Sequence, residues 1–383
     1  MKAQTLPCQK GLFSIPDDVH FINCAYMGPI ARAVEEAGVE ALRLKGFPAR
    51  ISPADFFTTS DEARRRFAGL INVPEPHRIA LVPSTGFAVA TVAKNLKPKA
   101  GQNIVVLFEQ FPSNVYAWRN FRKQGVEIRT VEPPASGERG KEWNTRLLEA
   151  IDPNTALVTV ENVHWSDGTK FDLEAVGQRA REVGAMFVVD GIQSIGALPF
   201  DQQRVRADAV ICLGYKWLLA GYSFGFAYFG ERFDVGEPLE ESWIARKGSQ
   251  DFARLVDYQD EYQPGALRYD FGERSNQVAL AMVNTSLRML ADWGVENIQA
   301  YCAELTREFN QAVRELGYTL EDERYRSAHL FGIRPPKGTD LEALRQRLAE
   351  RKVYVSVRGS AVRIGAHVYN DHHDMEALLD ALR

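Results

Sequence analysis

Short apolar runs alternate with helical stretches through the middle of the chain, and this alternation constrains the fold more than any other feature. Seven runs of strand length lie at 78–84, 103–109, 127–132, 155–163, 185–190, 208–213 and 224–230. Between several of them lie the helical stretches GFAVATVAKNL, NVYAWRNFRKQG and LEAVGQRAREVG. Strands that alternate with helices form a mostly parallel sheet covered on both faces. The sequence therefore predicts an α/β fold with a mostly parallel seven-stranded sheet between helices.

The pattern changes near residue 275, which predicts a second, smaller unit. Two long helices that meet at Gly294 are expected over 275–316, followed by an α+β block. The block should contain the strand AHLFGIRPP, the helix DLEALRQRLAERK, the strands VYVSVRG and AVRIGAHVY, and the helix DMEALLDAL. Before the sheet we expect a helix over 31–46 and another that opens at Thr59 or Ser60. We therefore divide the chain into an N-terminal segment, a large domain, and linking helices with a small C-terminal domain: 1–50, 51–275 and 276–383.

Composition narrows the class of protein. The 383 residues carry 46 basic and 50 acidic side chains without a long basic run, which argues against a nucleic-acid partner. The four cysteines form no CxxC pair, so neither a disulfide framework nor a zinc site is expected, and we predict no metal. Nowhere do eighteen apolar residues run together, so we expect no membrane span or signal peptide. These features are typical of a cytoplasmic protein.

Charged residues stand directly after two of the predicted buried strands. Lys216 follows the strand at 208–213 and is itself followed by Trp217, while Asp190 closes the strand at 185–190. Because the carboxyl ends of parallel strands meet at one edge of the sheet, both side chains should emerge there. A lysine among apolar residues is rarely left unpaired, although a lysine that extends to solvent is the simpler interpretation of Lys216 alone.

A third feature lies between the first strand and its helix. Ser84, Thr85 and Gly86 precede FAVATV, so their hydroxyls and free N–H groups form an anion site at a helix N-terminus. An ordinary helix cap would have the same residues. Together with the lysine and the aspartate, however, they match one cofactor. Pyridoxal 5′-phosphate (PLP) has an aldehyde for Lys216, a ring nitrogen for Asp190 and a phosphate for this helix end.

The sequence around these residues resembles a known family. The run FVVDGIQSIGALPFD, together with ADAVICLGYKWLL, is similar to the class V aminotransferase family of fold type I PLP enzymes. The resemblance extends from INCAYMGP near the start to RIGAHVYN near the end. It implies the fold of a fold type I PLP-dependent transferase, an amino acid as the small-molecule substrate, and a homodimer with shared active sites.

The resemblance also implies roles for residues around the cofactor. Gln193 would bind its phenolic oxygen, and Phe111 would stack on its ring, where many relatives have histidine. Tyr215 would bind the phosphate. His164 matches a position near the cofactor's oxygen, although the alignment could slip to Asn162 or Trp165.

On the substrate side, the resemblance implies that Arg363 grips the α-carboxylate. A planar guanidinium binds a carboxylate through two parallel hydrogen bonds and thereby orients the Cα–H bond. Arg274, Ser275 and Asn276 lie where relatives contribute phosphate or substrate contacts from the partner subunit, and we expect Asn276 to contact the substrate. GERSNQV departs from the GTPN-like form of several subfamilies, which puts these three roles in doubt.

Several reactions start from the same site. We expect an aminotransferase first and a PLP-dependent lyase second, while kynureninase-like hydrolysis, suggested by Phe111 and Tyr215, and epimerase-like reactions stay open. A persulfide-forming cysteine desulfurase is not expected, because no cysteine lies between Cys302 and Arg363. GYSFG at 221–225 has the GxSxG form of a hydrolase nucleophile, but a strand is expected to follow it instead of a helix. A cluster near the C-terminus is expected to cap a helix and not to bind metal: His367, His372, His373, Asp371 and Asp374.

Overall fold

A seven-stranded sheet forms the centre of the molecule. The structure is a computed structural model that describes residues 6–135, 138–359 and 361–383. The strands lie in the order β2 (Ile79–Val82), β8 (Gly225–Phe229), β7 (Ala209–Leu213), β6 (Met186–Asp190), β5 (Thr155–Glu161), β3 (Asn103–Leu107) and β4 (Glu127–Val131). β8 runs antiparallel to β2 and β7, and the other neighbours are parallel. The predicted mostly parallel seven-stranded sheet is confirmed.

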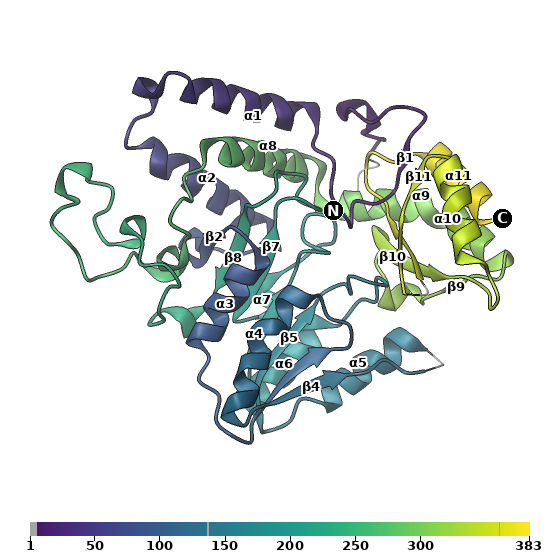
Figure 1. Cartoon of the computed structure of the whole chain (residues 1–383), viewed down its shortest axis with the longest axis horizontal. Helices are drawn as coiled ribbons and strands as arrows, with labels where there is room; N and C mark the ends of the chain where they lie inside the picture. The colour runs from purple at the N-terminus through teal and green to yellow at the C-terminus, as the bar shows by residue number, and fades with distance from the viewer. Residues whose placement is uncertain (1–5, 136–137, 360) are drawn as a thin grey trace.

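Helices cover both faces of this sheet (Figure 1). On one face the apolar sides of α3 (Thr85–Asn95) and α4 (Tyr116–Arg119) pack against alternate strand residues. The other face is covered by α2 (Asp55–Leu70), α5 (Arg139–Glu149), α6 (Leu173–Val183), the short α7 (Gln202–Val205) and α8 (Gln277–Trp293). Because both faces are buried, the strands are almost continuously apolar, which is why the sequence pattern revealed them.

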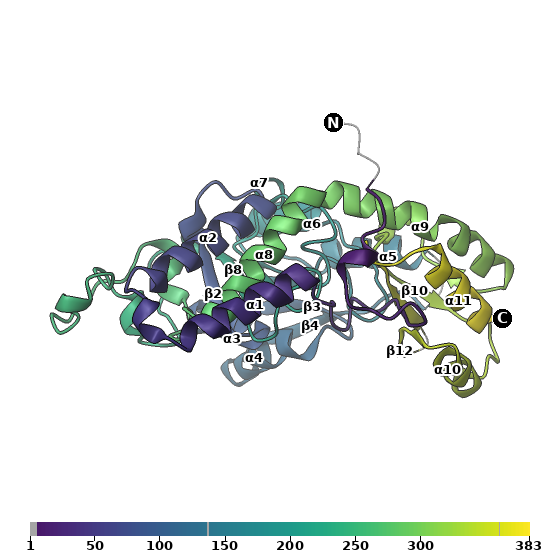
Figure 2. The ribbon, with the colours of Figure 1, turned by 90° about the horizontal axis from the view of Figure 1, so that it is seen from above.

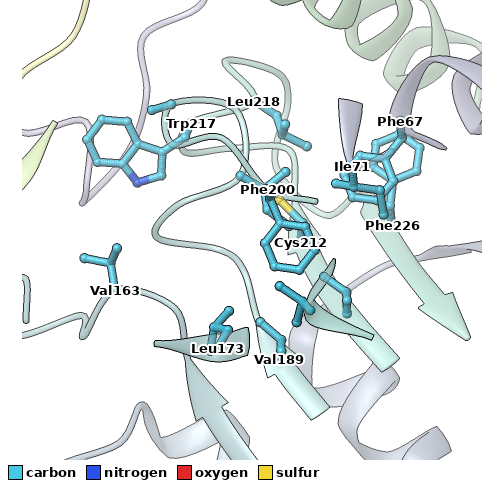
Figure 3. Packing of buried hydrophobic residues seen from close by; sticks show 14 of the residues in the cluster. Phe67, Ile71, Val163, Leu173, Val189, Phe200, Cys212, Trp217, Leu218 and Phe226 are labelled. Carbon is cyan, nitrogen blue, oxygen red and sulfur yellow. The ribbon is translucent and has the colours of Figure 1, made fainter. Parts of the chain in front are cut away.

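The core on the α2 side extends up to the residues that follow β7 (Figure 3). Phe67 of α2 stacks on Phe226 of β8 with ring centroids 4.4 Å apart. Trp217 and Leu218 are fully buried in the same cluster. Burying an aromatic or leucine side chain stabilises a fold by about 1.5–3 kcal/mol. The apolar residues after Lys216 therefore fix the backbone that carries the lysine.

A smaller α+β domain lies at one end of the molecule (Figures 1 and 2). Its antiparallel sheet has the order β12 (Ser356–Arg358), β13 (Ala361–Gly365), β10 (Leu330–Arg334) and β9 (Thr319–Leu320). A two-stranded parallel sheet joins β1 (His20–Phe21) to β11 (Val353–Tyr354). The domain also contains α10 (Leu341–Glu350) and α11 (His372–Leu382). The N-terminal part of the chain thus packs on its C-terminal part.

Two long helices connect the ends of the molecule. α8 packs against α1 (Arg32–Lys45) and α2, whereas α9 (Val295–Glu315) packs against α11 (Figure 2). Gly294 separates α8 from α9 at a φ of 77°, a conformation that favours glycine. The expected helix pair and its junction are confirmed, while the domain boundaries at residues 50 and 275 stay predictions.

Several local expectations were wrong. α2 begins at Asp55, before Thr59 and Ser60, because the Asp55 carboxylate binds the Ser52 N–H at 2.7 Å and closes the first turn. NVYAWRNFRKQG forms only the short α4 between two 3-10 turns. VYVSVRG divides into β11 and β12, which belong to different sheets. The strand predicted for AVRIGAHVY ends at Gly365, and α5 was not predicted at all.

Two further features concern the helices and the connection between β8 and α8. Among the described residues, no helix is both long enough and apolar enough to cross a bilayer. The connection between β8 and α8 makes a long excursion at the end of the molecule opposite the small domain, shown in teal to green in Figure 1. Its regular structure consists of four 3-10 turns, over Glu231–Phe233, Trp243–Ala245, Phe252–Arg254 and Gly265–Tyr269, and one isolated bridge between Arg246 and Tyr262.

Candidate active site

Lys216 lies three residues beyond the end of β7, at the carboxyl edge of the sheet. Only 7% of the residue is exposed. Its Nζ lies 5.6 Å from the ring centroid of Phe111 and 5.5 Å from that of Tyr215. Burial lowers the pKa of Lys216 to about 8, and the positive charge of Arg363 acts in the same direction while the carboxylate of Asp190 opposes it. A sizeable fraction of the amine is therefore neutral and nucleophilic near neutral pH.

Asp190 ends β6 on the neighbouring strand, as the sequence predicted. It pairs with Ile211 of β7 in the sheet register, which places both strand ends at one edge. One carboxylate oxygen, Oδ1, accepts a hydrogen bond from the Ile192 N–H at 3.1 Å. Burial, and then the nearby charge of Glu161, raise the pKa of Asp190 to about 7. A buried carboxylate of this kind gains most from a cationic partner.

Glu161 is a second carboxylate that the sequence reasoning missed. It ends β5 and lies opposite Asp190 in the parallel register. Its Oε1 accepts a hydrogen bond from the Phe111 N–H at 2.9 Å, and its Oε2 accepts one from the Trp165 N–H at 2.6 Å. Burial raises its pKa, although the charges of His164 and Lys216 act in the opposite direction. An acidic residue at the end of a strand could have indicated Glu161. It was not recognised because the predicted strand continued to Val163, which placed Glu161 inside the strand.

Trp165 packs on Phe111, one of the two rings beside the lysine amine. Phe111 and Trp165 meet edge to face, with ring centroids 5.5 Å apart and an angle of 84°. Glu109 adopts a positive φ of 52° just before Phe111, and its carbonyl accepts a hydrogen bond from the Trp165 indole at 2.6 Å. Strained backbone of this kind is common at functional sites, where the surrounding contacts hold it in place.

His164 does not take part in this group in the way the sequence suggested. Its Nε2 pairs with the carbonyl of Phe108 at 3.0 Å and its Nδ1 with the Ser166 hydroxyl at 2.9 Å. The ring also packs against Trp143, with centroids 4.9 Å apart. With both nitrogens bound to protein atoms, His164 has no free nitrogen for a ligand. Trp165, one of the two alternative positions, contacts Phe111 instead.

The Ser84, Thr85 and Gly86 stretch forms the N-terminus of α3. Ser84 caps the helix, because its hydroxyl accepts a hydrogen bond from the Phe87 N–H at 3.1 Å. A Cβ added to Gly86 would meet only the Ser84 hydroxyl, 3.8 Å away, so open space adjoins this helix end. The first N–H groups of a helix have no partner within it and attract anions. The residues present therefore fit a phosphate.

Gln193 has a fixed orientation. The Trp217 indole donates a hydrogen bond to its Oε1 at 3.0 Å, and its Nε2 donates one to the Ala25 carbonyl at 3.1 Å. Because the oxygen is already bound, the second proton on Nε2 is what the side chain offers to a ligand. That arrangement suits a phenolic oxygen.

The N-terminal segment packs against the backbone around the lysine. The Gly28 N–H donates a hydrogen bond to the Tyr215 carbonyl at 2.9 Å. A Cβ added to Gly28 would lie 2.1 Å from the Lys216 carbonyl oxygen, which is too close for any other residue. This segment therefore packs directly on the backbone of the lysine.

Arg363 reaches the site from β13 of the small domain and is 2% exposed. Its Nη1 donates a hydrogen bond to the Trp165 carbonyl at 2.5 Å, and its Nη2 donates one to the Ser356 hydroxyl at 3.4 Å. Nε is buried and has no hydrogen-bond partner among the described residues. Burial, and then the charge of Arg358, lower the pKa of Arg363 to about 10. This guanidinium has donors left for an anion.

The three residues after Glu273 make contacts with α2 and α8. Arg274 pairs with Asp270 at 2.8 Å, and the Ser275 hydroxyl donates to the Phe56 carbonyl at 2.7 Å. Asn276 caps α8 by accepting a hydrogen bond from the Ala279 N–H at 3.0 Å. None of these contacts involves the group around Lys216, so their predicted contribution to a neighbouring subunit stays a prediction.

Two sequence motifs that we did not assign to the active site have structural roles. GYSFG leads directly into β8, without the helix that a hydrolase nucleophile requires. Asp371 and Asp374 form a capping box at the start of α11, and Asp374 also binds His20 at 2.7 Å. Both carboxylates are thus used in holding the small domain together.

Known proteins are similar to this chain in sequence and in fold. A probable cysteine desulfurase of Methanothermobacter thermautotrophicus is 29% identical over 67% of this chain and 61% of its own length. Isopenicillin N epimerase of Streptomyces clavuligerus is 27% identical over 97% of this chain and 96% of its own. Among solved structures, a cysteine desulfurase of Escherichia coli superposes with a TM-score of 0.82 at 18% identity, covering 97% of this chain and 96% of that one. The cystine C–S lyase C-DES gives a TM-score of 0.84 at 18% identity, covering 96% and 97%.

The family assignment rests on a match along most of the chain. The family model described as aminotransferase class-V matches residues 53–381, from the first residues before α2 to the end of α11. The match includes all seven strands of the central sheet and every residue of the site described above except Ala25 and Gly28. The chain therefore belongs to the class V aminotransferase family of PLP-dependent enzymes.

Proposed function

We propose that this protein is an aminotransferase that acts on the α-amino group of an amino acid. The observation that carries the proposal is the buried Lys216, whose lowered pKa supplies a neutral amine near enough to the carboxylate of Asp190 and the guanidinium of Arg363 for both charges to act on it. An amine nucleophile, a carboxylate and a carboxylate-binding arginine are what the chemistry of amino acids on PLP requires.

We assign the cofactor contacts to residues already placed at this edge. The start of α3, with Ser84, Thr85 and Gly86, would hold the phosphate, and Tyr215 would contact it from the lysine side. Asp190 would accept a hydrogen bond from the protonated ring nitrogen, Gln193 would donate to the phenolic oxygen, and Phe111 would cover one ring face. When bound, PLP withdraws electrons from the Cα atom of an amino acid joined to its aldehyde carbon.

Lys216 would act twice. Its neutral amine would hold the cofactor through the aldehyde carbon, and the same amine, when free, would accept the Cα proton of the substrate. The pKa of about 8 leaves Lys216 basic enough to accept this proton and neutral often enough to do so at physiological pH. Phe111 has no ionisable group, so it cannot take part in this proton transfer.

Arg363 would hold the substrate's α-carboxylate. Its Nη1 is fixed on the Trp165 carbonyl and its Nη2 lies near Ser356, so the guanidinium cannot rotate freely. A carboxylate bound to a fixed guanidinium has a defined direction, which sets the Cα–H bond relative to the lysine.

Replacing Arg363 by alanine is expected to raise KM for the amino acid by about 100-fold, because a charge-assisted bidentate contact is lost. PLP content should change little, since Arg363 is assigned to the substrate and not to the cofactor. Steady-state kinetics and the absorbance of bound PLP measure the two quantities. Arg351→Ala, an exposed residue after α10, is the control. An unchanged KM would remove the assignment of Arg363.

Replacing Glu161 by glutamine is expected to extend cofactor retention to lower pH. Glu161 raises the pKa of Asp190, so removing its charge lets Asp190 keep its carboxylate form at more acidic pH. The fraction of PLP retained after dialysis across a pH series measures the shift. Glu149→Gln, on the exposed side of α5, should follow the wild-type profile. A retention profile identical to that of the wild type would mean that the two carboxylates do not interact.

A PLP-dependent lyase is the second candidate. Cys24, Cys212 and Cys302 are buried, and burial raises the pKa of each thiol. A persulfide-forming mechanism needs an accessible thiolate, which these three cysteines do not supply. The fourth cysteine, Cys8, is exposed, but its thiol faces the Asn370 carbonyl at 3.7 Å in the small domain. We therefore infer that cleavage of a C–S bond by this protein would be a direct elimination. The similarity to proteins named cysteine desulfurase and isopenicillin N epimerase, which are not named as aminotransferases, supports this second candidate.

The two candidates differ in what happens to the cofactor. We would mix the PLP-loaded protein with a panel of amino acids, without a keto acid, and record the visible spectrum and the products. An aminotransferase converts the cofactor to its pyridoxamine form, and a keto acid restores the original spectrum. A lyase releases ammonia and a fragment while the spectrum persists. Conversion of no amino acid by either route would refute the proposed function.

We further propose that the protein is a cytoplasmic homodimer whose sites are completed by the second subunit. Exposed apolar side chains on and after α1 support a subunit interface there: Val39, Leu42 and Phe47. The free cysteines suit a reducing compartment. Sedimentation equilibrium at micromolar concentration should give twice the 43.0 kDa chain mass, and a monomer would contradict the dimer.

A further inference from the structure

A second arginine lies beside Arg363 on the same face of the small domain. β12 and β13 are antiparallel, with Ser356 opposite Arg363 and Arg358 opposite Ala361. Residues two apart on a strand point to the same face of a sheet, so Arg358 shares a face with Ser356 and therefore with Arg363. The Arg358 guanidinium carbon lies 6.0 Å from the ring centroid of Trp165. Both arginines therefore approach the site residue Trp165.

Among the described residues these two cations form no ion pair, although the charge of Glu161 acts on Arg363 from farther away. Within the described part of the chain, neither guanidinium lies within 4.0 Å of a carboxylate oxygen, whereas most of the protein's buried arginines do. Arg358 donates a hydrogen bond to the backbone carbonyl of Val357 at 3.1 Å, and its other donors have no hydrogen-bond partner in the described chain. Two like charges side by side repel each other unless an anion binds them.

Trp165 sets the distance between the two arginines. Arg363 binds its backbone carbonyl, while Arg358 lies over its ring. The Trp165 ring also meets Phe111 edge to face, and the Phe111 ring is next to the Lys216 amine. A substrate held at Arg363 and Lys216 would therefore extend its side chain along Trp165 towards Arg358.

We propose that Arg358 binds a second carboxylate, so that the substrate is an amino acid with an acidic side chain. A guanidinium recognises a planar carboxylate better than a neutral amide because both hydrogen bonds carry charge. This inference rests on the proposed function only in assigning the α-amino group and α-carboxylate to Lys216 and Arg363. It adds the chemical class of the substrate, which neither the fold nor the relatives supply.

The test measures binding without turnover. Glutarate, which has two carboxylates and no amine, and butyrate, which has one, are titrated into the PLP-loaded protein by calorimetry. We expect glutarate to bind about 10- to 100-fold more tightly than butyrate, which corresponds to one charge-assisted contact. Arg358→Gln should remove this preference and leave butyrate binding unchanged. Arg351→Gln should retain it.

Each outcome decides the question. An equal affinity for both acids in the wild type, or a preference that survives Arg358→Gln, would overturn the assignment of Arg358. Arg358→Lys, which keeps the charge but not the planar geometry, should retain part of the preference and guards against misfolding of the glutamine variant. The activity is tested separately by the amino acid panel. If acidic amino acids are not converted but neutral ones are, the acidic substrate class is wrong and the proposed function stands.

Discussion

Replacing Lys216 by alanine is expected to lower kcat by at least about 10⁴-fold while the protein remains folded. The lysine is assigned both the bond to the cofactor and the transfer of the Cα proton, and loss of general acid–base catalysis alone costs about 10²- to 10⁴-fold. Removing an amine whose pKa burial lowers to about 8 also removes a buried charge, so the cofactor-free protein should not lose stability.

Steady-state kinetics and the thermal midpoint of unfolding check this pair of outcomes. Lys216→Arg keeps the positive charge but has no amine to join to an aldehyde, so it should be as inactive as the alanine variant. Lys170→Ala changes a half-buried lysine elsewhere in the fold and should keep activity within a few-fold. Activity in Lys216→Ala comparable to that of the wild type would refute the mechanism.

Replacing Asp190 by asparagine should stabilise the cofactor-free protein and nearly abolish its activity. The carboxyl group has a pKa of about 7 in the folded chain and about 4 when unfolded. Because the folded state binds the extra proton between these values, stability falls as pH rises from about 4 to 7, and the full cost remains above pH 7. At pH 8, the asparagine variant should gain on the order of 3 kcal/mol in the free energy of unfolding.

The loss of activity has a different cause. An amide cannot hold a proton on the ring nitrogen as a carboxylate does, so kcat should fall by about 10²-fold or more. Urea unfolding of the cofactor-free proteins at pH 8 and at pH 4, with kinetics of the loaded proteins, separates the two effects. Asp17→Asn, an exposed change, is the control. An asparagine variant that is less stable at pH 8 would show that Asp190 is held by contacts that favour its charged form.

The main sheet was predictable because its strands are buried on both faces. Val188, Val210 and their neighbours form continuous apolar runs, and each run has a defined end. The same reason made Asp190 and Lys216 visible, since charged residues at the ends of apolar runs stand out. Helix α5 escaped prediction because its buried side is narrow, with Trp143 and Leu147 in an otherwise polar stretch.

The local order of residues within the site depended on tertiary contacts. β5 ends at Glu161, whereas the apolar run continues to Val163, so the sequence hid the second carboxylate. His164 turns towards Phe108, Ser166 and Trp143, which brings Trp165 to the site instead. Residue spacing in the sequence does not predict these contacts, because the contacting residues lie up to 56 positions apart in the chain.

The small domain shows the same contrast between features that the sequence predicts and features that depend on tertiary contacts. The alternating pattern around Arg363 predicted a strand, and the resemblance gave the arginine a role. Its nearness to Arg358 follows from the pairing of β12 with β13 inside the small sheet, and its bond to the Trp165 carbonyl follows from how the two domains pack. Substrate recognition therefore depends on an arrangement that sequence patterns do not describe.

The most direct test of the central claim is to find which residue binds the cofactor covalently. The purified protein is loaded with PLP, reduced with borohydride to make the bond permanent, digested and analysed by peptide mass spectrometry. We expect one modified peptide, with the added mass on Lys216. Modification of a different lysine, or no modification despite bound PLP, would contradict the account of the active site.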